Sequence, residues 1–120
     1  MYKIIFYWNE RGDEPVRDFL LTLPIKNRKK IAVWIDLLKQ EGPHLRRPYA
    51  DKVKDKLYEL RIRQSSDQIR ILYFFLLGHK LIMLHGFRMK SSAIDFSDIQ
   101  LAEQRRLDFL QRIQSRKISL

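Results

Sequence analysis

Apolar and polar positions in the first third of the chain predict one strand followed by two helices. Residues 2–8 alternate with a period of two and are rich in aromatic and β-branched side chains, which predicts a strand that ends at residues 9–12. Along residues 13–23 and 24–42 the apolar positions instead recur every three or four residues, which is typical of amphipathic helices. Asp13 is expected to cap the first helix and Gly42 to end the second.

The rest of the chain predicts a loop, three strands and a last helix. Residues 42–55 hold two prolines and several charges and are expected to form a loop. Strands are predicted over residues 57–62, 69–77 and 80–87, joined by short turns into an antiparallel meander. An apolar stripe that begins near Ser97, as a possible N-cap, predicts the final helix.

These elements suit one α+β domain that covers residues 1–120. The expected order is β-α-α-β-β-β-α, with a small antiparallel sheet packed against the N-terminal helix pair and the C-terminal helix. The chain has no Cys, which excludes disulfides and thiolate chemistry. No signal peptide and no apolar run of membrane-spanning length is visible, so a cytoplasmic protein without a membrane partner is expected.

Charge points to a polyanionic partner. The chain carries 24 Lys and Arg against 14 Asp and Glu, a net charge of +10. The excess is concentrated in residues 26–63, which hold twelve basic and five acidic side chains. Such clustering favours nucleic acid as the partner, with an acidic protein or a membrane surface as the second choice.

Strand alternation indicates where the cations lie. Arg61 and Arg63 share one face of their strand with Glu59, while Leu60 and Ile62 point to the other face, so one side is expected to be core and the other to present guanidinium groups. Arg70 lies within an apolar strand, where a charge needs a partner. Both a pair with Glu59 and an anionic ligand satisfy that need.

Few of the known catalytic arrangements are present. The chain has no phosphate-binding glycine loop, no acidic cluster for two metals and three widely spaced histidines, so neither a metal nor another cofactor is expected. His85, followed closely by Arg88 and Lys90, forms a grouping suited to binding phosphate and moving a proton. RNA cleavage by attack of the 2′-hydroxyl on its own phosphate needs only such groups, with His85 or Tyr73 assisting proton transfer. The same residues suit simple nucleic-acid binding equally well.

The strand segments resemble a known toxin family. Leu57–Ile62, Ile69–Phe75 and Leu84–Phe87, together with Lys90 and Ala102, look like the phage Gp49-like, HigB-type toxins of the RelE/ParE superfamily. The resemblance runs from about residue 56 to 102. It implies a bacterial type II toxin that a cognate antitoxin neutralises, and for HigB-type members an mRNA interferase, an endoribonuclease that cuts messages on the ribosome.

The resemblance also implies roles for individual residues. Arg70 is expected to hold the scissile phosphate, Lys90 and Arg61 to stabilise charge, Phe87 to stack on a base and His85 to carry a proton. Arg63 and Lys54 are added on their charge alone, and Arg88 and Tyr73 complete the expected RNA-contacting set.

Two alternatives stay open at this point. After Phe87 the family commonly has two lysines and then a proline, whereas residues 88–95 contain one lysine and no proline. A toxin that does not cut RNA, such as the gyrase-directed ParE-like relatives, is therefore the second hypothesis. A plain nucleic-acid-binding module is the third.

Overall fold

The computed structural model describes residues 1–120 and has the α+β composition predicted from the sequence. In chain order its elements are β1 (Lys3–Phe6), α1 (Pro15–Leu21), α2 (Ile25–Glu41), the 3₁₀ turn η1 (Gly42–His44), β2 (Ala50–Lys54), β3 (Leu57–Gln64), β4 (Asp67–Leu76), β5 (Lys80–Arg88) and α3 (Phe96–Gln114). None of the helices combines the length and the apolar character needed to cross a bilayer.

The five strands form one sheet in the order β1-β5-β4-β3-β2. β3, β4 and β5 make the predicted antiparallel meander, and β2 adds a further antiparallel strand beside β3. β1, however, lies beside β5 and runs parallel to it. The expectation of a purely antiparallel sheet is therefore wrong. The chain crosses from β1 through α1 and α2 before it returns to the sheet, and such a crossover allows parallel pairing.

β2 is the element that the predicted order lacked. It lies in the segment predicted as a loop and pairs with β3, with Ala50 opposite Leu60 and Asp51 opposite Glu59. As an edge strand it can carry lysines at exposed positions, so its pattern looks like that of a polar loop. The helix starts differ slightly from the prediction. The residue before α1 is Glu14 rather than Asp13, and the residue before α3 is Asp95 rather than Ser97.

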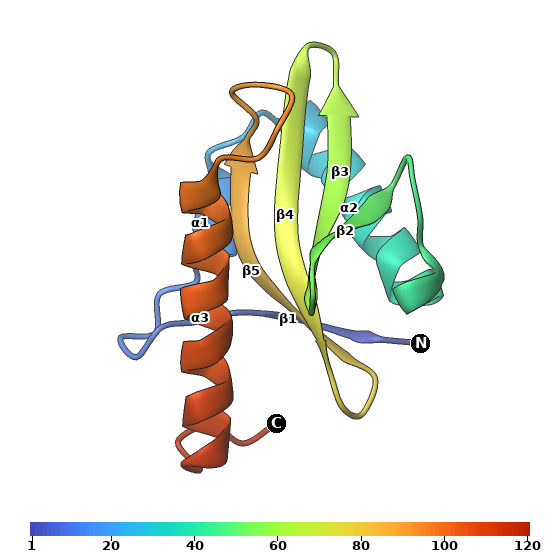
Figure 1. Ribbon diagram of the computed structural model, residues 1–120. Coiled ribbons are helices and arrows are strands. Elements are labelled where there is room, and N and C mark those ends of the chain that lie inside the picture. The colour runs from blue at the N-terminus through green and yellow to red at the C-terminus, as the bar shows by residue number, and fades with distance from the viewer.

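Both faces of the sheet are covered by helices (Figure 1). One core lies between the sheet and α1 with α2, and includes Val16, Ile31 and Leu38. The second lies under α3 and includes Ala102 and Phe109. The division of β3 into a core face and a guanidinium face holds only in part, since Leu57, on the same face as Arg61, is fully buried in the second core. The arginines lie beyond the N-terminal end of α3 on that face.

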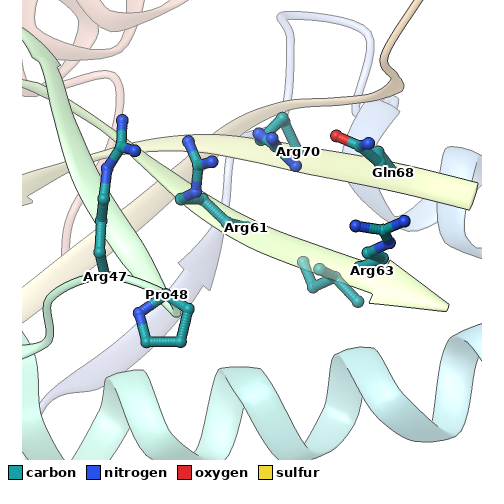
Figure 2. A pocket seen from close by; sticks show the side chains of 7 residues that line it. Arg47, Pro48, Arg61, Arg63, Gln68 and Arg70 are labelled. Atoms are coloured by element: carbon teal, nitrogen blue, oxygen red, sulfur yellow. The ribbon is translucent and has the colours of Figure 1, made fainter. Parts of the chain in front are cut away.

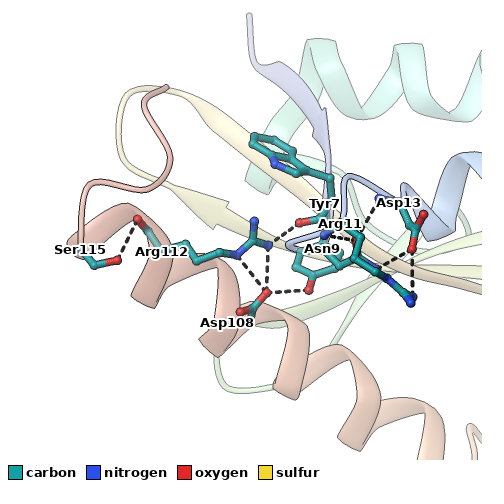
Figure 3. A network of polar contacts seen from close by, with 8 residues as sticks. Tyr7, Asn9, Arg11, Asp13, Asp108, Arg112 and Ser115 are labelled. Atoms are coloured by element: carbon teal, nitrogen blue, oxygen red, sulfur yellow. Dashed lines mark hydrogen bonds and ion pairs between the residues drawn. The ribbon is translucent and has the colours of Figure 1, made fainter.

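A polar cluster anchors the far end of α3 to the segment after β1 (Figure 3). The Tyr7 hydroxyl donates to Asp108 Oδ2 at 2.6 Å, and Arg112 Nη2 donates to the same oxygen at 2.8 Å. Arg112 also donates to the carbonyl oxygen of Trp8. Burial, together with the adjacent Asp108 carboxylate, raises the pKa of Tyr7 to about 12, so the hydroxyl keeps its proton and remains a donor.

Candidate functional site

A groove of about 500 Å³ opens over the end of β3 and is lined by four arginines and no carboxylate (Figure 2). We call it the arginine groove. Its lining residues are Arg47, Pro48, Arg61, Ile62, Arg63, Gln68 and Arg70. In Figure 2 the guanidinium groups of Arg47, Arg61 and Arg63 all project to the side away from the underlying helix.

Strand register brings these side chains together. Arg61 on β3 lies directly opposite Arg70 on β4, and Arg63 lies opposite Gln68. On the next strand Phe87 lies opposite Arg70. Because laterally paired residues in a sheet point to the same face, one row across three strands carries Arg61, Arg70 and Phe87.

Glu59 lies between the two paired arginines. Its Oε2 accepts a hydrogen bond from Arg61 Nη1 at 3.0 Å, and its Oε1 lies 2.9 Å from Arg70 Nε. The second contact is an ion pair whose N–H bond is not aligned with the oxygen. The carboxylate is almost completely buried, so the sequence-based alternative of an Arg70–Glu59 pair is realised in the structure.

Arg70 is a buried cation with spare hydrogen-bonding capacity. Burial, and then the nearby positive charge of Arg61, lower its pKa, while Glu59 partly compensates. Its Nη1 donates to the carbonyl oxygen of Ile69 at 3.2 Å. Burial and the repulsion from Arg61 both cost free energy while Arg70 is charged. Because a guanidinium stays protonated in proteins, a bound anion rather than loss of the proton offsets this cost.

Arg47 forms the opposite wall of the groove. It comes from the loop before β2, and its Nε contacts Asp51 Oδ2 at 2.7 Å. The hydrogen bond to Asp51 raises the pKa of Arg47 and lowers that of the carboxyl. The Arg47 side chain is 67% exposed, and an exposed pair of this kind contributes little stability, so Arg47 can turn toward a ligand at small cost.

A smaller hollow of about 280 Å³ continues the groove toward α3. It shares Arg47, Arg61 and Arg70 with the groove, but unlike the groove it is also lined by the carboxylates of Asp51 and Glu59. The segment after β5 forms another of its walls, through Met89, Ser92, Ala93 and Ile94. Lys90 belongs to this segment and is exposed, with no ion pair, whereas Arg88 lies 3.6 Å from Asp67. Lys90 therefore follows Met89, which lines the hollow, and its ammonium is free of any ion pair.

His85 is held on both sides of its ring. Its Nε2 lies 2.8 Å from Asp98 Oδ1, and its Nδ1 lies 3.5 Å from Arg105 Nη1. The ring stacks on Phe87 with centroids 4.8 Å apart. Burial lowers the pKa of His85, although the contact with Asp98 opposes the shift. A neutral ring that donates from Nε2 to Asp98 and accepts at Nδ1 satisfies all three groups.

Two predicted site residues lie away from the groove. Tyr73 is buried on the opposite face, where it stacks on Tyr58, and burial raises its pKa. Lys54, at the end of β2, lies 3.8 Å from Glu103 of α3. The structure therefore brings together Arg61, Arg63 and Arg70, with Phe87 and His85 behind them, but not Tyr73 or Lys54.

Sequence reasoning missed Arg47 as a groove residue and Glu59 as the carboxylate shared by two arginines. Arg47 was visible only as one charge in a segment predicted as a loop. The period of β3 did place Glu59 on the same face as Arg61. No group of three or more His, Asp or Glu side chains is arranged to hold a metal ion.

Comparisons with known proteins agree with this picture. The model of the family described as "Phage derived protein Gp49-like (DUF891)" matches residues 18–107. A Mycobacterium tuberculosis protein named "Putative toxin HigB3" is 43% identical over 54 residues, which cover 43% of this chain and 47% of that protein. The chain thus matches about half the length of this curated relative. Because the family model covers most of the chain, including the whole sheet from β2 to β5, this protein belongs to the phage-derived Gp49-like family.

Proposed function

We propose that this chain is the toxin of a type II toxin-antitoxin system and cleaves messenger RNA on the ribosome. The observation that carries the proposal is the arginine groove, whose four guanidinium groups and lack of a lining carboxylate suit a phosphodiester backbone. The Mycobacterium tuberculosis relative is named as a toxin, and this name supports the toxin part of the proposal.

The arginine pair would hold the scissile phosphate. Arg61 and Arg70 lie opposite each other, and the Nη2 atom of each makes no bond within the protein. Two donors that are already oriented stabilise the charge that develops on the phosphate oxygens. Arg47 and Arg63 then contact the neighbouring phosphates. We assign no phosphate contact to Arg88, since it lies opposite Ile69, pairs with Asp67 and does not line the groove.

Cleavage by this route needs two proton movements. The 2′-oxygen forms a bond to phosphorus as the 2′-hydroxyl proton passes to water, and the bond from phosphorus to the 5′-oxygen breaks. We assign to the Lys90 ammonium the proton that the departing 5′-oxygen takes up, since Lys90 is exposed and unpaired. His85 would carry a proton only after its contact with Asp98 breaks, and Phe87 would offer a ring edge to a base.

A cell-free translation reaction with mapping of RNA ends tests this function. The wild-type protein is expected to cut the translated message, and Arg61→Gln to slow cleavage by about 10²–10³-fold, the effect of removing one oriented donor. Arg61→Gln leaves Glu59 paired with Arg70, so the fold should survive. The control is Arg11→Gln, which removes an exposed arginine far from the groove. Intact transcripts with the wild-type protein would refute the proposal.

A second candidate is a toxin that acts without cutting RNA. It is favoured by one observation, that both ring nitrogens of His85 are already engaged and leave no histidine free in the groove. Inhibition of gyrase supercoiling, with transcripts left intact, would identify this activity.

The cognate antitoxin is a further part of the proposal. The chain carries a net charge of +10, and the arginine groove has no acidic lining residue, so an acidic segment of the partner would be drawn to it. Such a complex should compete with single-stranded RNA for the groove. If the antitoxin binds without reducing the RNA affinity, its binding surface lies outside the arginine groove.

A further inference from the structure

Glu59 is the one carboxylate that contacts both arginines of the paired row. Its two oxygens are divided between them, Oε2 to Arg61 at 3.0 Å and Oε1 to Arg70 at 2.9 Å. Glu59 precedes Arg61 by two residues on β3 and shares its face, so the backbone of one strand sets their spacing. The Glu59 side chain is 8% exposed; it does not line the groove itself, but it does line the smaller hollow beside it.

Two facts make a purely stabilising role a poor explanation. Like charges placed directly opposite each other in a sheet destabilise it, so the Arg61–Arg70 pair is costly by itself. A buried ion pair is also often no more stable than apolar side chains of the same size. A chain selected only for stability would therefore gain by replacing all three residues, whereas a chain that needs two cations at a fixed spacing needs the shared carboxylate.

The charge balance leaves the row able to bind an anion. One carboxylate serves two guanidinium groups, so the cluster keeps a net positive charge. Glu59 contacts Arg61 through a hydrogen bond from Nη1 and Arg70 through an ion pair with Nε, and it leaves Nη2 of both side chains free. Fixing one edge of a guanidinium orients its remaining N–H bonds, because the group is planar and rigid.

We propose that Glu59 is a positioning residue, which holds Arg61 and Arg70 at the spacing that grips one phosphate in the transition state. This inference rests on the proposed function. It assigns Glu59 no contact with the substrate. Its charge opposes binding of a polyanion, while its geometry favours the chemical step.

The test separates these two effects by steady-state kinetics on ribosomes programmed with a defined message. Glu59→Gln removes the negative charge and keeps the size of the side chain. Its kcat is expected to fall by about 10²-fold, the effect of a misplaced catalytic group, while KM stays constant or falls because the groove has become more positive. A merely structural role would not divide kcat and KM in this way.

The control for charge is Asp108→Asn. Asp108 is likewise shared, between Tyr7 and Arg112, but it lies at the other end of α3. The substitution changes the net charge by the same amount, so it reproduces any general increase in RNA affinity. Its kcat is expected to match that of the wild type, and a fall equal to that of Glu59→Gln would overturn the proposal.

Glu59→Asp covers the case in which Glu59→Gln does not fold. Aspartate keeps the charge, but its shorter side chain cannot reach both arginines, so kcat is expected to fall here too. A folded Glu59→Asp protein with the wild-type kcat would show that charge alone matters, and would overturn the proposal. Wild-type kcat in a folded Glu59→Gln protein would do the same.

A second measurement separates this inference from the proposed function. If the wild-type protein cuts no message, the cleavage proposal fails. The positioning role of Glu59 can still be tested, by measuring how mobile the arginine side chains are. In the free protein the Nε–Hε NMR signals of Arg61 and Arg70 should show rigid side chains, and both should become mobile in Glu59→Asp. Signals of equal rigidity in the two proteins would overturn the positioning role.

Discussion

His85 joins the sheet to the start of α3 through both nitrogens of its ring. Asp98 contacts one nitrogen, and Arg105 contacts the other while donating to the carbonyl oxygen of Leu84 at 2.8 Å. The ring also supports Phe87 at the back of the arginine row. At the scale of the single residue, the histidine expected to carry a proton is packed behind the groove, with both ring nitrogens in contact with side chains of α3.

Acid is therefore expected to weaken the fold through His85. Burial lowers the folded-state pKa of His85 below the ordinary value of about 6.5, so the unfolded chain binds the proton more tightly. The contribution of neutral His85 to the free energy of unfolding is therefore complete above about pH 6.5 and is lost as the pH falls below that value. Urea unfolding between pH 8 and 5 should show that the free energy of unfolding declines as the pH falls. The decline should be less steep in His85→Gln. Parallel curves for the wild type and His85→Gln would contradict this prediction.

Gly86, the next residue, permits the close approach of α1 to β5. A Cβ atom at this position would lie 2.6 Å from Cδ2 of Phe19. Gly86→Ala is expected to lower the free energy of unfolding by about 1–3 kcal/mol, as other overpacked cores do. Urea unfolding measures the change, and Phe19→Leu in the same chain should recover part of it. Full stability of Gly86→Ala would mean that α1 moves freely over the sheet.

At the scale of the element, α3 depends on contacts at both of its ends. Asp98 near its start faces His85, and Asp108 and Arg112 near its end meet Tyr7 (Figure 3). Between these ends Ala102 and Phe109 pack into the core beneath the helix. The helix therefore covers part of its sheet face, and the hollow that reaches Arg61 and Arg70 lies beside its first turn, at Ile99.

Tyr7→Phe tests the anchor at the end of α3. The substitution removes the hydroxyl that donates to Asp108 and keeps the ring packing, so the free energy of unfolding is expected to fall by about 1.5 kcal/mol, the lower end for a bond to a charged group. Urea unfolding gives the value. Tyr2→Phe, whose hydroxyl makes no hydrogen bond, serves as the control and should change stability by less than about 0.5 kcal/mol. Equal effects of the two substitutions would show that the hydrogen bond from Tyr7 to Asp108 does not stabilise the fold.

At the scale of the whole molecule, positive charge continues from the arginine groove onto α2. Lys26, Lys29 and Lys30 lie in the first half of this helix, which has no acidic residue in its first turn, and none of the three forms an ion pair. Cations at a helix N-terminus oppose the helix dipole, so their placement brings no stability to α2. Lys30 donates to the carbonyl oxygen of Arg63 and so connects the helix to the groove.

RNA affinity should therefore depend on α2 as well as on the groove. The double variant Lys26→Gln and Lys29→Gln is expected to reduce the slope of log affinity against log salt by about 1.4, or about 0.7 for each lost phosphate contact on a single strand. Titration of a single-stranded RNA over a range of salt concentrations measures the slope. The matched control is Arg116→Gln with Lys117→Gln, exposed at the end of α3. An unchanged slope in the α2 variant would show that Lys26 and Lys29 do not contact the RNA.

The period of the side chains was enough to place α1, α2, β3, β4, β5 and α3, because each element repeats its own spacing within a few neighbouring residues. The basic excess and the shared face of Glu59, Arg61 and Arg63 followed from the same local information. The short β2 escaped, because an edge strand with alternate lysines has no apolar period to detect.

Tertiary structure alone decided which of these side chains meet. The sequence by itself determined the elements, the charge and the strand faces, since these depend on neighbours along the chain. The parallel pairing of β1 with β5, the pairing of Arg61 with Arg70 and the approach of Arg47 depend instead on register between strands and on the path of a loop. Register is set by the combined packing of both cores, a long-range property that no single segment carries.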